Sequence, residues 1–322
     1  MQRRIFGFIQ FLILLIFLLP VGSDTVRSEI GDVPLQLEEE PAEEIAKYLF
    51  GVEGFSEEQK FSAPMGIFYD KHNNEIYVAD TRNNQVDIFD SEGQPLFQIR
   101  SEQGLKAPLD VLVDAESQIY VSHIGKNALQ LFNFRGEHLE DLYAPDETPF
   151  SPGRLCFDSQ GNLYVVDKNK AEILVYDPAG DFKFRFGGRG KGEGKFRMIS
   201  GIAVDSAGQI CVADSRQAST QIFDNTGHFL LSFGGRGVRD SEFSFPGGIC
   251  IDEKDRIWVV DAFKHQVKVF GTDGTFLFQF GVFGPEPGQL FFPIDLALDG
   301  KGRAYILEKG ASRLQAFEIN GW

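Results

Sequence analysis

The feature that most constrains the fold is a pattern that recurs six times along the 322 residues, with a period of about 43 to 49 residues. Each copy begins with Phe or Leu, often near a Pro, and continues with a short apolar run that ends in Asp. A polar turn, a second apolar run, a third run with an aromatic residue and a glycine turn complete the copy. Because such units fold as small repeated elements, the chain is expected to be an array of them.

The apolar runs within each copy are short and rich in Val, Ile, Phe and Tyr, and Gly, Asp and Asn turns separate them. This composition and length are typical of short antiparallel strands. No periodic segment of helix length accompanies them. Five copies carry a fourth run after the glycine, such as TFLFQF at 275–280, whereas the sixth ends at Gly321-Trp322.

The fourth strand of the last copy is found near the start of the sequence. AKYLFGVEGFSEEQKF at 46–61 has the layout of TFLFQFGVFGPEPGQLFF at 275–292. A strand lent to the last unit closes a ring and leaves no open edge between the first and last units. The sequence therefore predicts an all-β fold over residues 45–322: a monomeric six-bladed β-propeller of four-stranded antiparallel blades, with an N-terminal strand closing the last blade. A short helix at 46–50 is the alternative.

The repeated motif resembles that of NHL repeats. It reads F-x-x-P-x-G-I-x-x-D, then I-Y-V-x-D, then V-x-V-F-D, and GIAVDSAGQICVAD at 201–214 and GGICIDEKDRIWVVD at 247–261 are the closest matches. The resemblance covers residues 46–322 and implies a propeller. It implies less about function, because propellers of this kind include protein-interaction modules, RNA binders and a metal-dependent amidating lyase, and related rings include lactonases.

The N-terminal residues indicate export. Arg3 and Arg4 precede an uncharged apolar run at 5–22, so residues 1–23 are expected to be a signal peptide or a retained single-helix membrane anchor. The next segment, 24–44, contains many acids and two prolines and is expected to be an acidic linker. The sequence thus predicts an extracytoplasmic protein, periplasmic or anchored and facing outward.

The formal net charge of −16 argues against nucleic acid as a partner, because phosphate binding requires clustered Lys and Arg. The three cysteines, Cys156, Cys211 and Cys250, lie inside apolar runs and are expected to be buried free thiols.

Functional positions are sought where the copies depart from their own pattern. The residue two after the Pro position should lie near the axial mouth, and glycine is usual there. The six copies have, in order, Gly66, Asp110, Arg154, Gly201, Gly248 and Asp295. The end of the second run should share this face, and it is Asp in four copies but His123 and Glu308 in two.

These departures form the set of candidate ligand-binding residues at the axial mouth: Asp110, His123, Arg154, Asp295 and Glu308. One interpretation is that Arg154 and the carboxylates orient a small ligand, or that the His and the acids hold a divalent ion. The other is that Asp110 and Arg154 pair across neighbouring blades. The four repeated aspartates have a simpler use, since their carboxylates can accept hydrogen bonds from the following turn.

The glycine-rich segments FGGRGKGEG at 186–194 and FGGRGVRD at 233–240 are expected to be loops between blades, because no helix follows them to present N–H groups to a phosphate. Their cations give four candidate docking residues: Arg189, Lys191, Arg236 and Arg239. We therefore expect a non-catalytic scaffold that binds a protein or envelope component through its loop face. The alternative is a metal-dependent lyase or lactonase-like hydrolase at the axial mouth, and a divalent cation enters only under that alternative.

Overall fold

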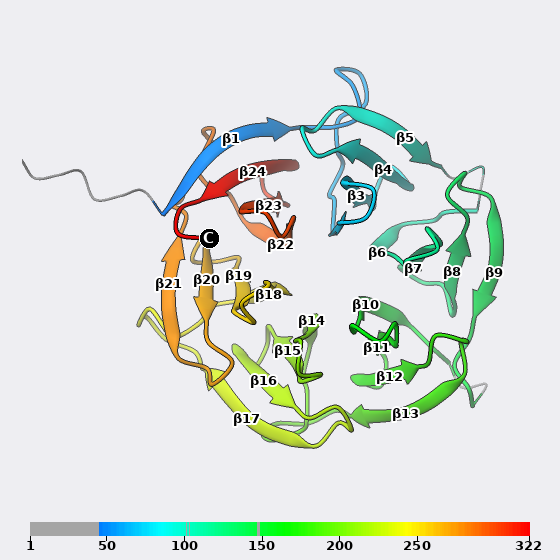
Figure 1. Cartoon of the computed structure of the whole chain (residues 1–322), viewed down its shortest axis with the longest axis vertical. Helices are drawn as coiled ribbons and strands as arrows, with labels where there is room; N and C mark the ends of the chain where they lie inside the picture. The colour runs from blue at the N-terminus through cyan, green and yellow to red at the C-terminus, as the bar shows by residue number, and fades with distance from the viewer. Residues whose placement is uncertain (1–44, 101, 103, 147–148) are drawn as a thin grey trace, which may run out of the picture. The chain divides into compact units, whose positions relative to one another are not determined.

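The computed structural model describes residues 45–100, 102, 104–146 and 149–322. This part of the chain contains 24 β-strands and no helix, joined into six four-stranded sheets. The sheets follow one another around a central axis in a closed ring (Figure 1). The predicted six-bladed propeller is confirmed. The segments expected to be a signal peptide or anchor (1–23) and an acidic linker (24–44) lie outside the described residues.

The first three blades are each built from four consecutive strands. Blade 1 contains β2 (Gly66–Asp70), β3 (Glu75–Asp80), β4 (Gln85–Asp90) and β5 (Pro95–Ile99). Blade 2 contains β6 (Pro108–Val113), β7 (Ile119–His123), β8 (Leu129–Phe132) and β9 (His138–Leu142). Blade 3 contains β10 (Pro152–Phe157), β11 (Leu163–Asp167), β12 (Glu172–Tyr176) and β13 (Phe182–Gly187).

Blades 4 and 5 follow the same order, and blade 6 takes its outer strand from the start of the described chain. Blade 4 contains β14 (Ile199–Val204), β15 (Ile210–Asp214), β16 (Ser219–Phe223) and β17 (Phe229–Gly234). Blade 5 contains β18 (Pro246–Ile251), β19 (Ile257–Asp261), β20 (Gln266–Phe270) and β21 (Phe276–Phe280). Blade 6 contains β22 (Pro293–Leu298), β23 (Arg303–Glu308), β24 (Arg313–Ile319) and β1 (Ala46–Val52).

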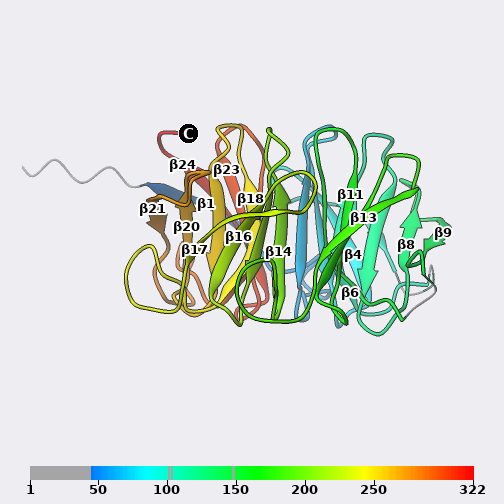
Figure 2. The same cartoon turned by 90° about the horizontal axis from the view of Figure 1, so that it is seen from below.

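The first strand of each blade lies nearest the axis and the fourth lies at the rim (Figure 1). Because the strands are antiparallel, the turns between strands one and two and between strands three and four lie at one end of the ring. The turns between strands two and three, and the loops from one blade to the next, lie at the other end (Figure 2). The ring therefore has two different faces.

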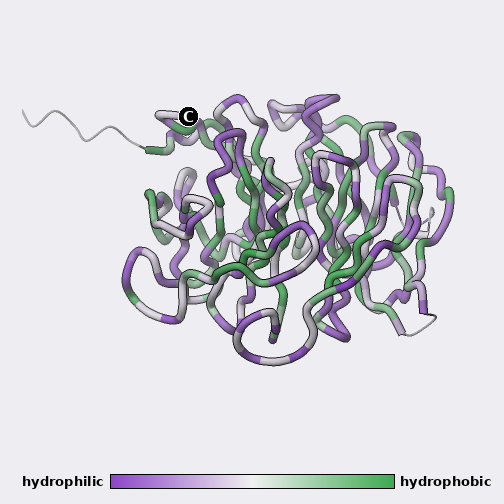
Figure 3. The backbone as a smooth tube through the Cα atoms, turned by 60° about the horizontal axis from the view of Figure 1, so that its bottom comes forward, coloured by the Kyte–Doolittle hydropathy of each residue, from purple (hydrophilic) through white to green (hydrophobic). Residues whose placement is uncertain are grey.

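The core is divided into six apolar clusters, and each lies between two neighbouring blades. The cluster between blades 2 and 3, for example, joins Leu112 and Leu131 to Leu155 and Val165. Side chains alternate between the two faces of a strand, so each sheet can contribute to the clusters on both sides. Figure 3 shows the resulting pattern, with hydrophobic stretches along the strands and hydrophilic stretches in many of the turns.

Strand β1 closes the ring by pairing antiparallel with β24. The register runs from Ala46 opposite Ile319 to Val52 opposite Leu314, with an irregularity between Tyr48 and Phe50. The predicted borrowed strand is confirmed, and the alternative of a helix at 46–50 is wrong. Among the described residues, no helix has the length and apolar character needed to cross a membrane.

Candidate functional site

Three of the predicted candidate residues meet at the ring axis. Arg154 Nη1 lies 2.7 Å from Asp295 Oδ2 and 3.4 Å from Asp110 Oδ1. The Arg154 Nε–H also donates to the Ser200 carbonyl at 3.0 Å, and the Leu155 N–H donates to Asp110 Oδ2 at 2.9 Å. Since these residues come from the inner strands β10, β6 and β22, the cluster, called here the axial triad, ties blades 2, 3 and 6 together.

Glycine at the neighbouring axial positions makes room for the triad. A Cβ at Gly66 would collide with the side chain and backbone of Asp110, and a Cβ at Gly248 would collide with Asp295. The usual glycine of the repeat is therefore retained where a carboxylate from the next blade needs the space.

The triad is electrostatically self-contained. Burial raises the pKa of Asp110 and of Asp295, and the Arg154 guanidinium opposes this rise. The pKa of Arg154 is in turn raised, because the attraction of Asp295 and Asp110 outweighs the effect of burial. Arg154 therefore stays charged, and its charge is directed at protein carboxylates.

The other two candidates, His123 and Glu308, do not join the triad. His123 is fully buried, and its Nδ1 lies 3.0 Å from the Lys106 carbonyl. Glu308 is also fully buried and accepts from the Phe291 N–H at 2.6 Å and from Arg313 Nε at 2.8 Å. Within the described ranges, no group of three or more His, Cys, Asp or Glu side chains has a geometry that could hold a metal ion.

Both residues instead do the work of the repeated aspartates, which fasten the loop entering each blade. Asp214, for example, accepts from the N–H groups of Arg197 and Met198 before β14, as well as from Gln217 in the turn that follows β15. The sequence predicted the bond to the following turn but not the bond to the preceding loop. That second bond depends on a contact between segments about 16 residues apart.

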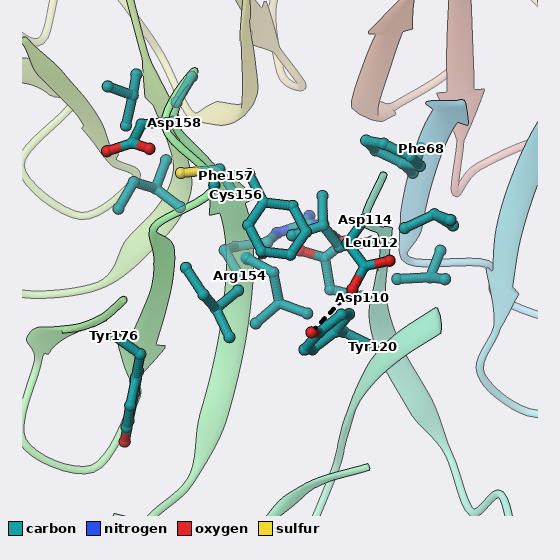
Figure 4. A pocket seen from close by; sticks show the side chains of 18 of the residues that line it. Phe68, Asp110, Leu112, Asp114, Tyr120, Arg154, Cys156, Phe157, Asp158 and Tyr176 are labelled. Carbon is teal, nitrogen blue, oxygen red and sulfur yellow. Dashed lines mark hydrogen bonds and ion pairs between the residues drawn. The ribbon is translucent and has the colours of Figure 1, made fainter. Parts of the chain in front are cut away.

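A cavity of about 860 Å³ lies along the ring axis beside the triad, where the inner strands of all six blades line it, and extends between blades 2 and 3 (Figure 4). Asp110, Arg154 and Asp295 line its inner end, and its outer part is lined by turn residues such as 114–116 and 158–161. These turns join first to second strands, so the cavity opens on the face opposite to the mouth indicated by the repeat alignment. No residue of the turns between second and third strands lines it.

Two of the three cysteines also line the cavity. Cys211 is buried, as predicted, whereas Cys156 and Cys250 are only partly buried and face the cavity. Burial raises the pKa of all three thiols, so they stay protonated near neutral pH. All three are free.

The turns within the blades differ in charge between the two ends of the ring, whereas the loops between blades contain both signs. The turns between second and third strands (81–84, 124–128, 168–171, 215–218, 262–265 and 309–312) contain seven Lys or Arg and no Asp or Glu. The seven cations, called here the basic ring, are Arg82, Lys126, Lys168, Lys170, Arg216, Lys264 and Lys309. The turns of the opposite face contain fourteen acids and five Lys or Arg. We call these the basic face and the acidic face.

The predicted docking residues Arg189, Lys191, Arg236 and Arg239 are exposed in two loops that lie on the basic face. Arg189 also donates to the carbonyls of Lys168 and Asn169, so it binds its loop to a turn that carries part of the basic ring. The charged loops noticed in the sequence thus lie on the same face as the basic ring, and Arg189 contacts one of its turns.

An aromatic patch on the basic face was not predicted. It consists of Phe245, Phe263, His265, Phe283, Phe291 and Phe292, whose rings contact one another at the boundary of blades 5 and 6. Phe263 is 56% exposed and Phe283 is 64% exposed. The signal was present in the sequence, since Phe263 and Phe283 occupy loop positions where polar residues are expected.

Comparison with known proteins gives both sequence and structural matches. A family profile described as a 6-bladed beta-propeller matches residues 137–233, and an NHL repeat profile matches residues 243–270. NHL-repeat-containing protein 4 of Mus musculus is 31% identical over 118 residues, which cover 37% of this chain and 79% of that protein. Protein brain tumor of Drosophila melanogaster is 28% identical over 144 residues, and the match spans 43% of this chain and only 14% of that protein.

Among solved structures, a streptogramin B lyase superposes with a TM-score of 0.63 at 13% identity, covering 84% of this chain and 98% of the lyase. A putative gluconolactonase superposes with a TM-score of 0.63 at 16% identity, covering 87% of this chain and 93% of the other. Likeness at this level of identity shows a shared fold.

Proposed function

Because the chain belongs to the NHL-repeat family of six-bladed β-propellers, we propose that it is a binding scaffold whose basic face docks an acidic protein. The observation that carries this proposal is the basic ring, in which every one of the six turns around the axis contributes a cation and none contributes an acid. On a chain with a net charge of −16, such segregation concentrates positive potential on one face. A positive face attracts and orients a negatively charged partner.

The aromatic patch gives this face an apolar contact point beside the charges. Exposed contiguous aromatic residues are unusual on a soluble protein surface and commonly mark interaction sites. Phe263 lies in the same turn as Lys264 of the basic ring. We therefore expect the partner segment to combine acidic side chains with at least one large apolar side chain.

We further propose that the scaffold acts outside the cytoplasm. The support is the Arg3-Arg4 pair followed by the uncharged apolar run at 5–22, the arrangement of an export signal or a single-helix anchor. The partner is then a protein or another component of the cell envelope.

The test uses a synthetic peptide of alternating Glu and Leu and its Lys-Leu counterpart, with binding measured by fluorescence anisotropy at low and at physiological ionic strength. The Glu-Leu peptide is expected to bind, and binding should weaken as salt screens the charges. The triple variant Arg82→Glu, Arg216→Glu, Lys309→Glu should bind about tenfold or more weakly, because three exposed charges are reversed.

The matched control places the same charge change on the acidic face: Arg135→Glu, Lys254→Glu, Lys301→Glu. This variant has the same net charge as the first, so a general loss of attraction would weaken both equally. Equal binding by the two triple variants, or preference for the Lys-Leu peptide, would refute the proposal. A tighter complex with single-stranded RNA than with the Glu-Leu peptide would also contradict it.

A metal-dependent lyase or lactonase-like hydrolase is the second candidate, because solved propellers with these activities in their names share the fold and a cavity reaches the axis here. The predicted ion ligands, however, are divided between the axial triad and the buried sites of His123 and Glu308. Elemental analysis of the purified protein and of the variant Asp110→Ala, His123→Ala, Asp295→Ala separates the two functions. Stoichiometric Ca or Zn that is lost in the variant would favour the enzyme.

A further inference from the structure

The cavity between blades 2 and 3 lies on the acidic face and has no part in the docking function proposed above. We propose that it binds a small organic cation, an ammonium group carried on an apolar or aromatic body. Its volume of about 860 Å³ is in the range of small-molecule sites. The argument for the ligand class rests on the walls, the rim and the inner end of the cavity.

The walls are apolar and come from both blades. Leu112, Leu131 and Leu142 line the cavity from blade 2, and Leu155 and Leu163 line it from blade 3. Such a surface excludes small, strongly hydrated ions and favours a ligand with a hydrocarbon body.

Two aromatic rings stand where the walls meet the turns. Tyr120 and Phe157 make an edge-to-face contact, with ring centroids 5.4 Å apart, across the boundary of the two blades (Figure 4). Both rings are only partly buried, so they remain accessible from the cavity. A cation close to the face of an aromatic ring is attracted to it, and the attraction grows where water is excluded.

The rim is negative. Five carboxylates line the cavity near its opening: Asp114, Glu116, Glu140, Asp158 and Asp177. Three of them act together on the Tyr120 hydroxyl. Burial raises the pKa of Tyr120, and the negative charges of Asp114, Glu116 and Glu140 raise it further. None of the five forms an ion pair within 4.0 Å in the described part of the chain. Asp114, Asp158 and Asp177 accept N–H hydrogen bonds from their own turns, but no cation of the protein pairs with any of the five carboxylates in this part of the chain.

The cations that line the cavity do not cancel this field. Lys71 pairs with Glu253 at 2.5 Å, and Arg154 at the inner end pairs with Asp110 and Asp295. An anionic ligand would meet five rim carboxylates and no uncommitted cation. The arrangement selects for positive charge on a ligand that also fills the apolar interior.

The experiment compares three probes of similar size and different charge: 2-phenylethylammonium, 3-phenylpropionamide and 3-phenylpropionate. Binding to the full chain is followed by saturation-transfer NMR and by calorimetric titration. The ammonium probe should bind with a Kd of about 1 mM or below, and the carboxylate probe at least about tenfold more weakly. The amide should fall between them.

Variants locate the site. Glu116→Gln with Glu140→Gln removes two exposed rim charges and should weaken the ammonium probe about fivefold, whereas Glu57→Gln with Glu58→Gln, on the basic face, should leave it unchanged. Leu142→Lys places a cation among the walls and should abolish binding. Folding of each variant is checked by circular dichroism.

Three results would overturn the proposal. The first is carboxylate binding as tight as ammonium binding. The second is ammonium binding that the Glu116 and Glu140 changes leave unaltered in a folded protein. The third is the lack of saturable binding by any of the three probes.

Discussion

At the scale of single residues, the axial positions show how a repeat can depart from its pattern without losing its fold. Asp110, Arg154 and Asp295 replace glycine in three blades, and glycine at 66 and 248 leaves room for the two carboxylates. Two carboxylates and one guanidinium then satisfy one another near the axis. A buried charge is costly unless it is paired, so the three residues depend on one another.

Removing the positive charge of Arg154 should therefore lower the stability of the folded protein. Arg154→Met leaves Asp110 and Asp295 facing each other without a counter-ion, and we expect a loss of about 3 to 5 kcal/mol in the free energy of unfolding. Urea denaturation followed by circular dichroism measures the loss. Adding Asp110→Asn and Asp295→Asn to this variant should restore part of it, because no unpaired charge then remains.

Arg82→Met is the control for this prediction, since Arg82 is exposed in a turn and should cost less than about 0.5 kcal/mol. A loss below about 1 kcal/mol for Arg154→Met would mean that water or another group compensates the carboxylates.

His123 makes the stability depend on pH. Burial lowers its pKa to about 4, from about 6.5 in an unfolded chain. Between these values the unfolded chain binds a proton that the folded chain does not. The contribution of His123 to stability is thus complete above about pH 6.5 and is lost as the pH falls toward 4.

The change His123→Asn isolates this effect, because the Asn amide can donate a hydrogen bond to a carbonyl, as His123 Nδ1 does to Lys106, but does not titrate. Between about pH 7.5 and pH 5, the natural protein should lose about 2 kcal/mol more unfolding free energy than the variant. Denaturation curves of both proteins at the two pH values give the difference. Parallel losses would show that His123 is protonated in the folded state at the lower pH.

The alignment of the repeats gave the strand positions of the five candidates but not the direction of their side chains, and only Asp110, Arg154 and Asp295 meet at the axis. The alignment predicted that His123 and Glu308 each end the second strand of a blade. In the structure they end β7 and β23, the second strands of blades 2 and 6. Whether such a side chain enters the axis or the blade depends on strand register and on the loop packed against it. Those are contacts between segments, and repeat spacing alone does not contain them.

At the scale of strands, the ring depends on a single non-consecutive pairing, that of β1 with β24. Tyr48 contacts Phe317, with ring centroids 6.1 Å apart, and Val52 is buried in the cluster between blades 6 and 1. The similarity between 46–61 and 275–292 was sufficient to predict the strand. It could not predict the irregularity between Tyr48 and Phe50, because that depends on the partner strand.

Weakening this pairing should cost stability and open an edge. Tyr48→Ala is expected to lower the free energy of unfolding by about 2 to 3 kcal/mol, by loss of apolar contact. Because partial release of β1 exposes the edge of β24, the variant should also form dimers or larger species at high concentration. Denaturation and size-exclusion chromatography measure the two effects.

Leu96→Ala is the matched change in β5, the outer strand of blade 1, where Leu96 is 50% exposed. It should leave both stability and size nearly unchanged. If Tyr48→Ala behaves like this control, the side chains of β1 contribute little and backbone pairing alone closes the ring.

At the scale of the whole molecule, the net charge of −16 conceals a strong separation of charge between the turns at the two ends of the blades. Antiparallel strands place alternate turns at opposite ends, so residues that alternate along the sequence are collected into a basic ring and an acidic face. The cations of the turns could have been counted from the sequence once the strands were assigned. The cavity could not, because its shape depends on the side chains that all six inner strands and the boundary of blades 2 and 3 place around it.

Closure of the ring by β1 also has a consequence for synthesis. The first strand of the propeller to leave the ribosome has to wait for the last, since about 260 residues separate β1 from β24. At typical elongation rates of roughly 5 to 20 residues per second, this delay is about 13 to 50 seconds. During that time neighbouring blades can form, but β1 has no partner. A chain whose synthesis stops before β24 keeps β1 unpaired. The exposed β1 is then a feature by which proteases and chaperones can recognise incomplete chains.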